Sequence, residues 1–141
     1  MLDIHDLCIE FPGTNGPTPV VQNASLSVDK GEVVGIIGES GAGKSTIGNA
    51  IIGMLPTTGY VKSGKILFDG DDIVSMGQKE IQHLRGSHLT YIFQNPLTAL
   101  NPLLTIEKQV SETITLRSNT SAGDAKEVVH SLLKRVGFPD P

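Results

Sequence analysis

A glycine-rich run in the first third of the chain carries the clearest chemical signal. It reads Gly38-Glu39-Ser40-Gly41-Ala42-Gly43-Lys44-Ser45 and matches the pattern G-x-x-x-x-G-K-[ST] at every defined position. Glycine lets a backbone fold closely around a phosphate, so that successive N–H groups form an anion-binding concavity. Lys44 would contact the β- and γ-phosphates as a point charge, and the Ser45 hydroxyl would give Mg²⁺ one oxygen ligand. The residues predicted to bind phosphates are Gly38, Ser40, Gly41, Ala42, Gly43, Lys44, Ser45 and Thr46.

Such a loop requires a buried strand directly before it and a helix directly after it. Residues 32–37 form a β-branched run without polar alternation, which is typical of a strand buried on both faces. Residues 44–55 have apolar positions at helical spacing and stop at Pro56. The alternative is a plain glycine-rich turn, but the flanking elements favour a nucleoside triphosphate site at the helix N-terminus.

The other predicted elements divide the chain into a strand-rich part and a helical part. Strands are expected at 2–11, 20–28, 61–68 and 89–93, loops at 12–19 and 95–102, and helices at 78–85, 105–117 and 123–136. A Ser121-x-x-Asp124 pattern predicts the start of the last helix, and Gly137 its end. We expect a nucleotide-binding core over 1–95 and a helical part over 96–141.

Composition excludes several classes of protein. The 141 residues are 38% hydrophobic and 18% charged, which is typical of one globular domain. Fifteen acidic residues against eleven basic ones give a net charge of -4, so we expect no nucleic-acid partner, which would need a clustered basic face. No apolar run is long enough to span a bilayer, and we expect a cytoplasmic protein.

Two classes of nucleotide-binding protein fit the sequence poorly. A GTPase should show D-x-x-G and N-K-x-D, and neither occurs. A small-molecule kinase needs arginines to stabilise the transferred phosphoryl group, but Arg85, Arg117 and Arg135 are scattered.

The longer motifs resemble those of the ATP-binding cassette family, the nucleotide-binding subunits of ABC transporters. Val28–Thr46 is similar to the family's strand, turn and Walker A segment, Gly64–Ile73 to its G-x-I-x-x-D-G-x-D-I hairpin, and Tyr91–Pro96 to the strand before its Q-loop. Gly38–Gly41 together with Gln94–Pro102 is similar to subunits of bacterial oligopeptide, dipeptide and nickel importers.

This resemblance implies an α/β fold with a P-loop NTPase (RecA-like) core. The core would be accompanied by an N-terminal antiparallel β part and by the beginning of an α-helical subdomain, so that the fold would be incomplete. It also implies ATP and Mg²⁺ as ligands, with transmembrane permease subunits and a second ATP-binding subunit as partners. The protein would then lie on the inner face of the cell membrane and contact it only through the permease.

Three further positions take roles from the resemblance. Gln94 matches the Q-loop glutamine, a Mg²⁺ and γ-phosphate contact with a catalytic role; alternatively it is a polar strand end. Phe11 matches the aromatic residue that stacks on adenine; alternatively it ends a strand and faces the core. Val20 lies where the family packs an aliphatic residue against the base or ribose.

Asp69 permits two interpretations. Ile66-Leu67-Phe68-Asp69 resembles a Walker B strand, whose acid would organise magnesium, but Gly70 directly after it favours a turn. The match to the family's hairpin also favours the turn.

Several family motifs are missing from the 141 residues: the L-S-G-G-Q signature, the Walker B strand with its glutamate, and the H-loop histidine. In the family, the Walker B strand and its neighbour lie between the Walker A strand and the strand before the Q-loop. We therefore expect a truncated chain, the ATP-binding portion of an ATPase subunit that powers import of peptides or a related small solute. By itself it would bind MgATP without hydrolysing it. The alternative is a nucleotide-binding or assembly module that never hydrolyses ATP.

Overall fold

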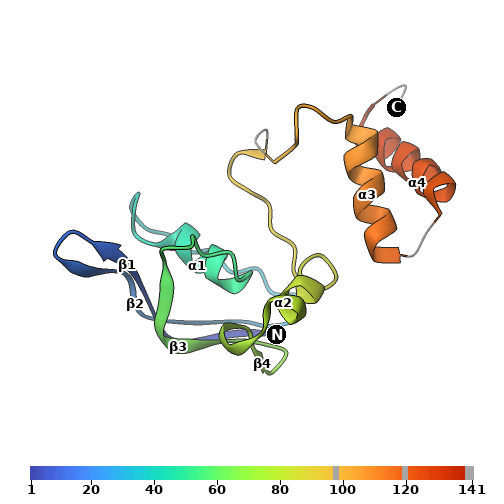
Figure 1. Ribbon diagram of the computed structural model, residues 1–141. Coiled ribbons are helices and arrows are strands. Elements are labelled where there is room, and N and C mark those ends of the chain that lie inside the picture. Colours follow the sequence, from blue (N-terminus) through green and yellow to red (C-terminus); the bar gives the residue numbers. More distant parts are fainter. Residues whose placement is uncertain (97–98, 119–120, 139–141) are drawn as a thin grey trace. The chain divides into compact units, whose positions relative to one another are not determined.

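The computed structural model describes residues 1–96, 99–118 and 121–138 (Figure 1). They form two compact units, Met1–Tyr91 and Ile92–Pro141. Each unit is considered by itself below. Among the described residues, none of the helices has both the length and the apolar character required to cross a membrane.

The first unit is built on an antiparallel sheet with the strand order β2-β1-β3-β4. Its strands are β1 (Leu2–Gly13), β2 (Gly16–Val28), β3 (Tyr60–Phe68) and β4 (Asp71–Asp72). The predicted strands at 2–11, 20–28 and 61–68 are confirmed. The predicted loop at 12–19 is wrong, because β1 and β2 stay paired up to Gly13 and Gly16 and leave only a tight turn between them.

The core of this unit lies where the sheet meets the helix α1 (Lys44–Ile51), which covers one face of the sheet in Figure 1. The buried residues are Ile4, Leu7, Ile9, Val21, Ile47, Ala50, Ile66, Ile73 and Ile81. Each large aliphatic side chain buried here contributes about 1.5–3 kcal/mol to folding. The short 3-10 helix η1 (Ile73–Ser75) and helix α2 (Gln78–Leu84) close the core at the end of α1.

Helix α1 ends at Ile51, earlier than the predicted end at residue 55. Gly53 has a φ of 61°, which stops the helix, and an added Cβ there would clash with Ile81 of α2. The Arg85 guanidinium donates hydrogen bonds of 2.7 Å to the carbonyls of Ile52 and Gly53. A cation at the C-terminus of a helix also interacts favourably with the partial negative charge there. Arg85 therefore stabilises the end of α1 at this position.

The strands predicted at 32–37 and 89–93 are absent from the described structure. Val33 and Ile37 are 96% and 97% exposed, and Ile92 is 87% exposed. A strand buried on both faces forms only when neighbours pair with its edges, and no strand among the described residues pairs with either segment. The β-type pairing of Leu89 is an isolated bridge to Arg85.

The second unit contains two helices, α3 (Ile106–Ser118) and α4 (Ala122–Arg135), close to the predicted bounds. The Ser121 hydroxyl accepts a hydrogen bond from the Asp124 N–H at 3.2 Å, and Gly137 has a φ of 96°, so both predicted helix ends are confirmed. Glu107 of α3 lies 3.5 Å from Lys126 and 3.4 Å from His130 of α4, which ties the two helices together.

Candidate functional site

The glycine-rich loop leads directly into α1, as the sequence predicts. Gly41 and Gly43 have φ values of 82° and 84°, which residues with a side chain rarely adopt. Gly43 is the residue before the helix, no side chain caps the first turn of α1, and that turn contains no acidic residue. The N–H groups at the start of α1 therefore face an electrostatic environment that favours an anion.

Gly43 also packs tightly against β2. An added Cβ would lie 2.8 Å from the carbonyl oxygen of Val20 and 3.0 Å from Cγ2 of Val21, whereas Gly41 has open space around it. The strand thus fixes the helix end of the loop through Gly43, while Gly41 needs glycine only for its backbone conformation.

This contrast gives a prediction for two alanine variants. Gly41→Ala should cost about 1–2 kcal/mol, because it adds only left-handed strain. Gly43→Ala should cost about 1–3 kcal/mol more, since the methyl group also overlaps the Val20 backbone. Thermal unfolding of both variants against the parent measures the difference, and equal losses would show that Gly43 is not held against β2.

Lys44 is the first residue of α1, and its side chain extends back over the preceding loop. Its ammonium donates to the carbonyl oxygens of Gly38 at 2.8 Å and Glu39 at 2.6 Å. The Ala42 N–H donates to the Glu39 carbonyl at 3.2 Å, which closes a turn in the same segment. A positive charge, positive-φ glycines and a helix N-terminus therefore converge, and this arrangement fits a polyphosphate chain.

The two hydroxyl residues after Lys44 occupy the first turn of α1. Ser45 is exposed and Thr46 is half-buried. An exposed hydroxyl beside the predicted phosphate-binding loop fits the hard oxygen ligand that Mg²⁺ prefers, with water and phosphate oxygens as its other ligands.

The sheet brings Val20 and Phe11 to the same hairpin. The Val20 carbonyl faces Gly43, and Phe11 of β1 pairs with Thr18 of β2, two positions before Val20. Both side chains are half-buried. The ring of Phe11 lies against Gly59, where an added Cβ would be 2.6 Å from two ring carbons. One side of Phe11 is therefore packed, as a core-facing strand end would be, and the residue also packs against the core without being fully buried.

The structure places Gln94 in the second unit and the loop in the first. Gln94 is exposed and lies in a bend after Phe93. Its role toward Mg²⁺ and phosphate stays a prediction. Leu97 and Thr98, part of the predicted loop that follows, lie outside the described residues.

Asp69 lies in a turn. Asp69 and Gly70 have φ values of 49° and 97° and connect β3 to β4, so the turn interpretation is confirmed over the Walker B one. Two positive φ values at an Asp-Gly pair are typical of a type I′ hairpin. The amino group of Met1 donates a hydrogen bond to the Asp69 carboxylate and lowers its pKa.

Two contacts that support the site are not evident from the sequence pattern. An added Cβ at Gly48 of α1 would lie 3.2 Å from a ring carbon of Tyr91, so this glycine lets Tyr91 pack on the helix. Gly53 and Arg85 together fix the opposite end of α1. The only local signal was a glycine inside or just after a helix, where glycine is otherwise unfavourable.

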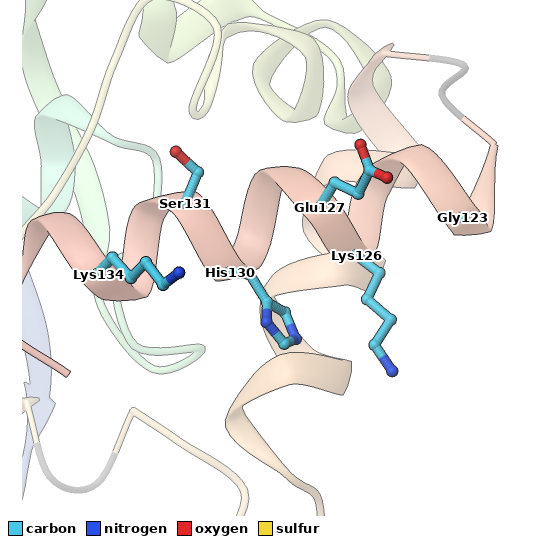
Figure 2. Close-up of a pocket in the computed structure, with 6 residues that line it drawn as sticks. All are labelled: Gly123, Lys126, Glu127, His130, Ser131 and Lys134. Atoms are coloured by element: carbon cyan, nitrogen blue, oxygen red, sulfur yellow. The ribbon is translucent and has the colours of Figure 1, made fainter. Parts of the chain in front are cut away.

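A further hollow runs along α4 in the second unit (Figure 2). Its lining residues are Gly123, Lys126, Glu127, His130, Ser131 and Lys134. None of the residues predicted to bind nucleotide is among them.

Comparison with known proteins identifies the family of the chain. Residues 21–141 match the sequence model of the family described as ABC transporter. The chain belongs to the ABC transporter family. This ABC chain is 39% identical over its whole length to the oligopeptide transport ATP-binding protein OppD of Bacillus subtilis (strain 168), of which it covers 40%. It is 38% identical to the dipeptide transport ATP-binding protein DppD of Escherichia coli (strain K12), of which it covers 43%.

Solved ABC cassettes share the fold. The dimeric post-hydrolysis structure of the ATP-binding cassette MJ0796, bound to ADP and Pi, matches with a TM-score of 0.78 at 22% identity. That match covers 95% of this chain and 56% of the other. The α/β fold class of an incomplete ABC cassette is thus confirmed, and the ABC chain spans about two fifths of the length of the curated relatives given above.

Proposed function

We propose that this chain is the ATP-binding portion of an ATPase subunit that powers import of peptides or a related small solute. The observation that carries the proposal is the loop between Gly38 and Ser45, where Lys44 and two positive-φ glycines surround the start of α1. The names of the relatives support the transport role, since both are ATP-binding proteins of oligopeptide or dipeptide transport.

Each predicted residue takes one part in this proposal. The loop and the N-terminus of α1 bind the phosphates, and Lys44 neutralises charge on the terminal ones. Mg²⁺ supplies further neutralisation of the phosphate oxygens, and Ser45 and Gln94 would hold it. Phe11 and Val20 receive the base and ribose.

The same proposal assigns partners and location. The chain would pair with a second ATP-binding subunit and dock on transmembrane permease subunits at the cytoplasmic face of the membrane. The dimeric cassettes among the structural neighbours support the pairing. The core would span 1–95, and the first part of the helical subdomain 96–141.

Calorimetric titration of the chain tests the proposal. We expect binding of ATP and of inorganic triphosphate, strengthened by Mg²⁺, and no measurable binding of adenosine, because the loop recognises phosphate. Adenosine binding as tightly as ATP would overturn the assignment of the loop as the main binding element.

A further inference from the structure

Gly59 has to be a glycine because of its contact with Phe11, and the reason is space rather than backbone conformation. Gly59 has no positive φ, so its backbone conformation would admit other residues. The space around Gly59 does not admit a side chain, because an added Cβ would lie 2.6 Å from Cε1 and Cζ of Phe11 and 3.2 Å from Cδ1. Gly59 therefore leaves a recess for the aromatic ring.

The residues next to this contact hold it in place. Glu10, beside Phe11, is only 7% exposed and pairs in register with Tyr60, beside Gly59. The Tyr60 hydroxyl donates to Glu10 Oε2 at 2.8 Å, and the Lys62 ammonium donates to Glu10 Oε1 at 2.6 Å. Both Glu10 oxygens are thus tied to β3.

The pKa shifts of Glu10, Tyr60 and Lys62 agree with stable hydrogen bonds among the three side chains. Hydrogen bonds from Lys62 and then Tyr60 hold the pKa of the Glu10 carboxyl below its usual range. The hydrogen bond to Glu10 raises the pKa of the Lys62 ammonium and of the Tyr60 hydroxyl. Glu10 therefore stays ionised and Lys62 stays charged at neutral pH, and the cross-strand anchor persists. The N–H of Gly59 also donates to the Pro56 carbonyl at 2.8 Å, which fixes the backbone on the other side.

The anchored ring is connected to the phosphate-binding loop through one hairpin. Phe11 pairs with Thr18, and two residues further along β2 the Val20 carbonyl packs on Gly43. A shift of the ring would therefore change the distance between a stacked base and the loop that holds its phosphates. Base stacking on an aromatic ring depends on such placement.

We propose that Gly59 is a positioning residue for the nucleotide base: its missing side chain allows the half-buried Phe11 ring to pack beside the start of β3, from where the ring would stack on adenine. This inference rests on the proposed ATP site. Gly59 itself need not touch the nucleotide, and its effect passes through Phe11.

A double-mutant cycle tests the inference with Gly59→Ala, Phe11→Ala and the double variant. Phe11→Ala should weaken ATP binding at least fivefold and leave inorganic triphosphate unchanged, since triphosphate has no π-face. Gly59→Ala should weaken ATP binding at least threefold, again with triphosphate unchanged. In the Phe11→Ala background, Gly59→Ala should have no further effect, because the group through which it acts is gone.

Matched variants separate the possible outcomes. Gly123→Ala in α4, where the nearest atom would be 3.9 Å from the new Cβ, serves as the glycine control and should bind ATP like the parent. Equal weakening of ATP by Gly59→Ala with and without Phe11, or equal loss of triphosphate, would overturn the inference. If Lys44→Ala weakened the binding of neither ATP nor inorganic triphosphate, the proposed ATP site itself would be overturned.

A second variant covers the case in which Gly59→Ala does not fold. Tyr60→Phe removes one hydrogen bond to Glu10 and leaves the recess open. It should weaken ATP binding about twofold or more in the parent and not at all in the Phe11→Ala background. Unchanged ATP affinity of Tyr60→Phe would then contradict the role of this anchored contact.

Discussion

Replacing Lys44 with alanine is expected to lower the affinity of the chain for MgATP about tenfold or more, which corresponds to about 1.4 kcal/mol. The ammonium lies inside the loop, on the carbonyls of Gly38 and Glu39, where a terminal phosphate would find it at short range. A charge-assisted hydrogen bond to phosphate is roughly twice as strong as a neutral one, and alanine removes it completely.

A fluorescent ATP analogue measures this loss by titration. Lys65→Ala is the matched control, because Lys65 is an exposed lysine of β3 and has no predicted role in binding. The control should bind like the parent. If Lys44→Ala also binds like the parent, Lys44 does not face the phosphates and the site assignment fails.

The second large effect concerns turnover: the purified 141-residue chain is expected to bind ATP without hydrolysing it at a measurable rate. Attack on a γ-phosphoryl group needs a positioned water and charge stabilisation on all sides of the transferred group. In the proposed function, the loop, Ser45 and Gln94 would supply only the cradle and part of the metal shell. By resemblance to the family, a glutamate after the Walker B strand, a histidine and a second subunit's signature motif supply the rest.

A phosphate-release assay decides this, with Lys44→Ala as the control for contaminating ATPases. Since the missing groups act on the transition state, the deficit should fall on kcat while ATP binding persists. Release of about one phosphate per second that disappears in Lys44→Ala would show that these residues form a complete catalytic site.

The glycine-rich loop conformation and the start of the helix after it could be predicted from sequence because their information is local. Gly43, Lys44 and Ser45 are consecutive, and the helix that follows them is signalled within a few residues. The turn at Asp69 and the start of α4 at Ser121 were predictable for the same reason. In each case the side chain that determines the structure acts on backbone close to it in sequence.

The predictions that failed depend on partners distant in sequence. Residues 32–37 have the composition of a buried strand, but a strand needs neighbours, and composition does not indicate whether those neighbours pair. The contact of Phe11 with Gly59 joins residues on two strands, and nothing in the pattern around Gly59 signals an aromatic neighbour. The early end of α1 likewise depends on Arg85, a residue of a later segment.

The hydrogen bonds of Lys44 to the Gly38 and Glu39 carbonyls have a consequence for the energetics of capture. The loop is preorganised, because its own cation bridges the backbone that would otherwise have to be immobilised when a ligand arrives. In the proposed site, an incoming phosphate would accept from an ammonium that is already in place, and little conformational entropy would be lost at that moment. The residue that would attract the phosphate would thus also lower the entropic cost of receiving it.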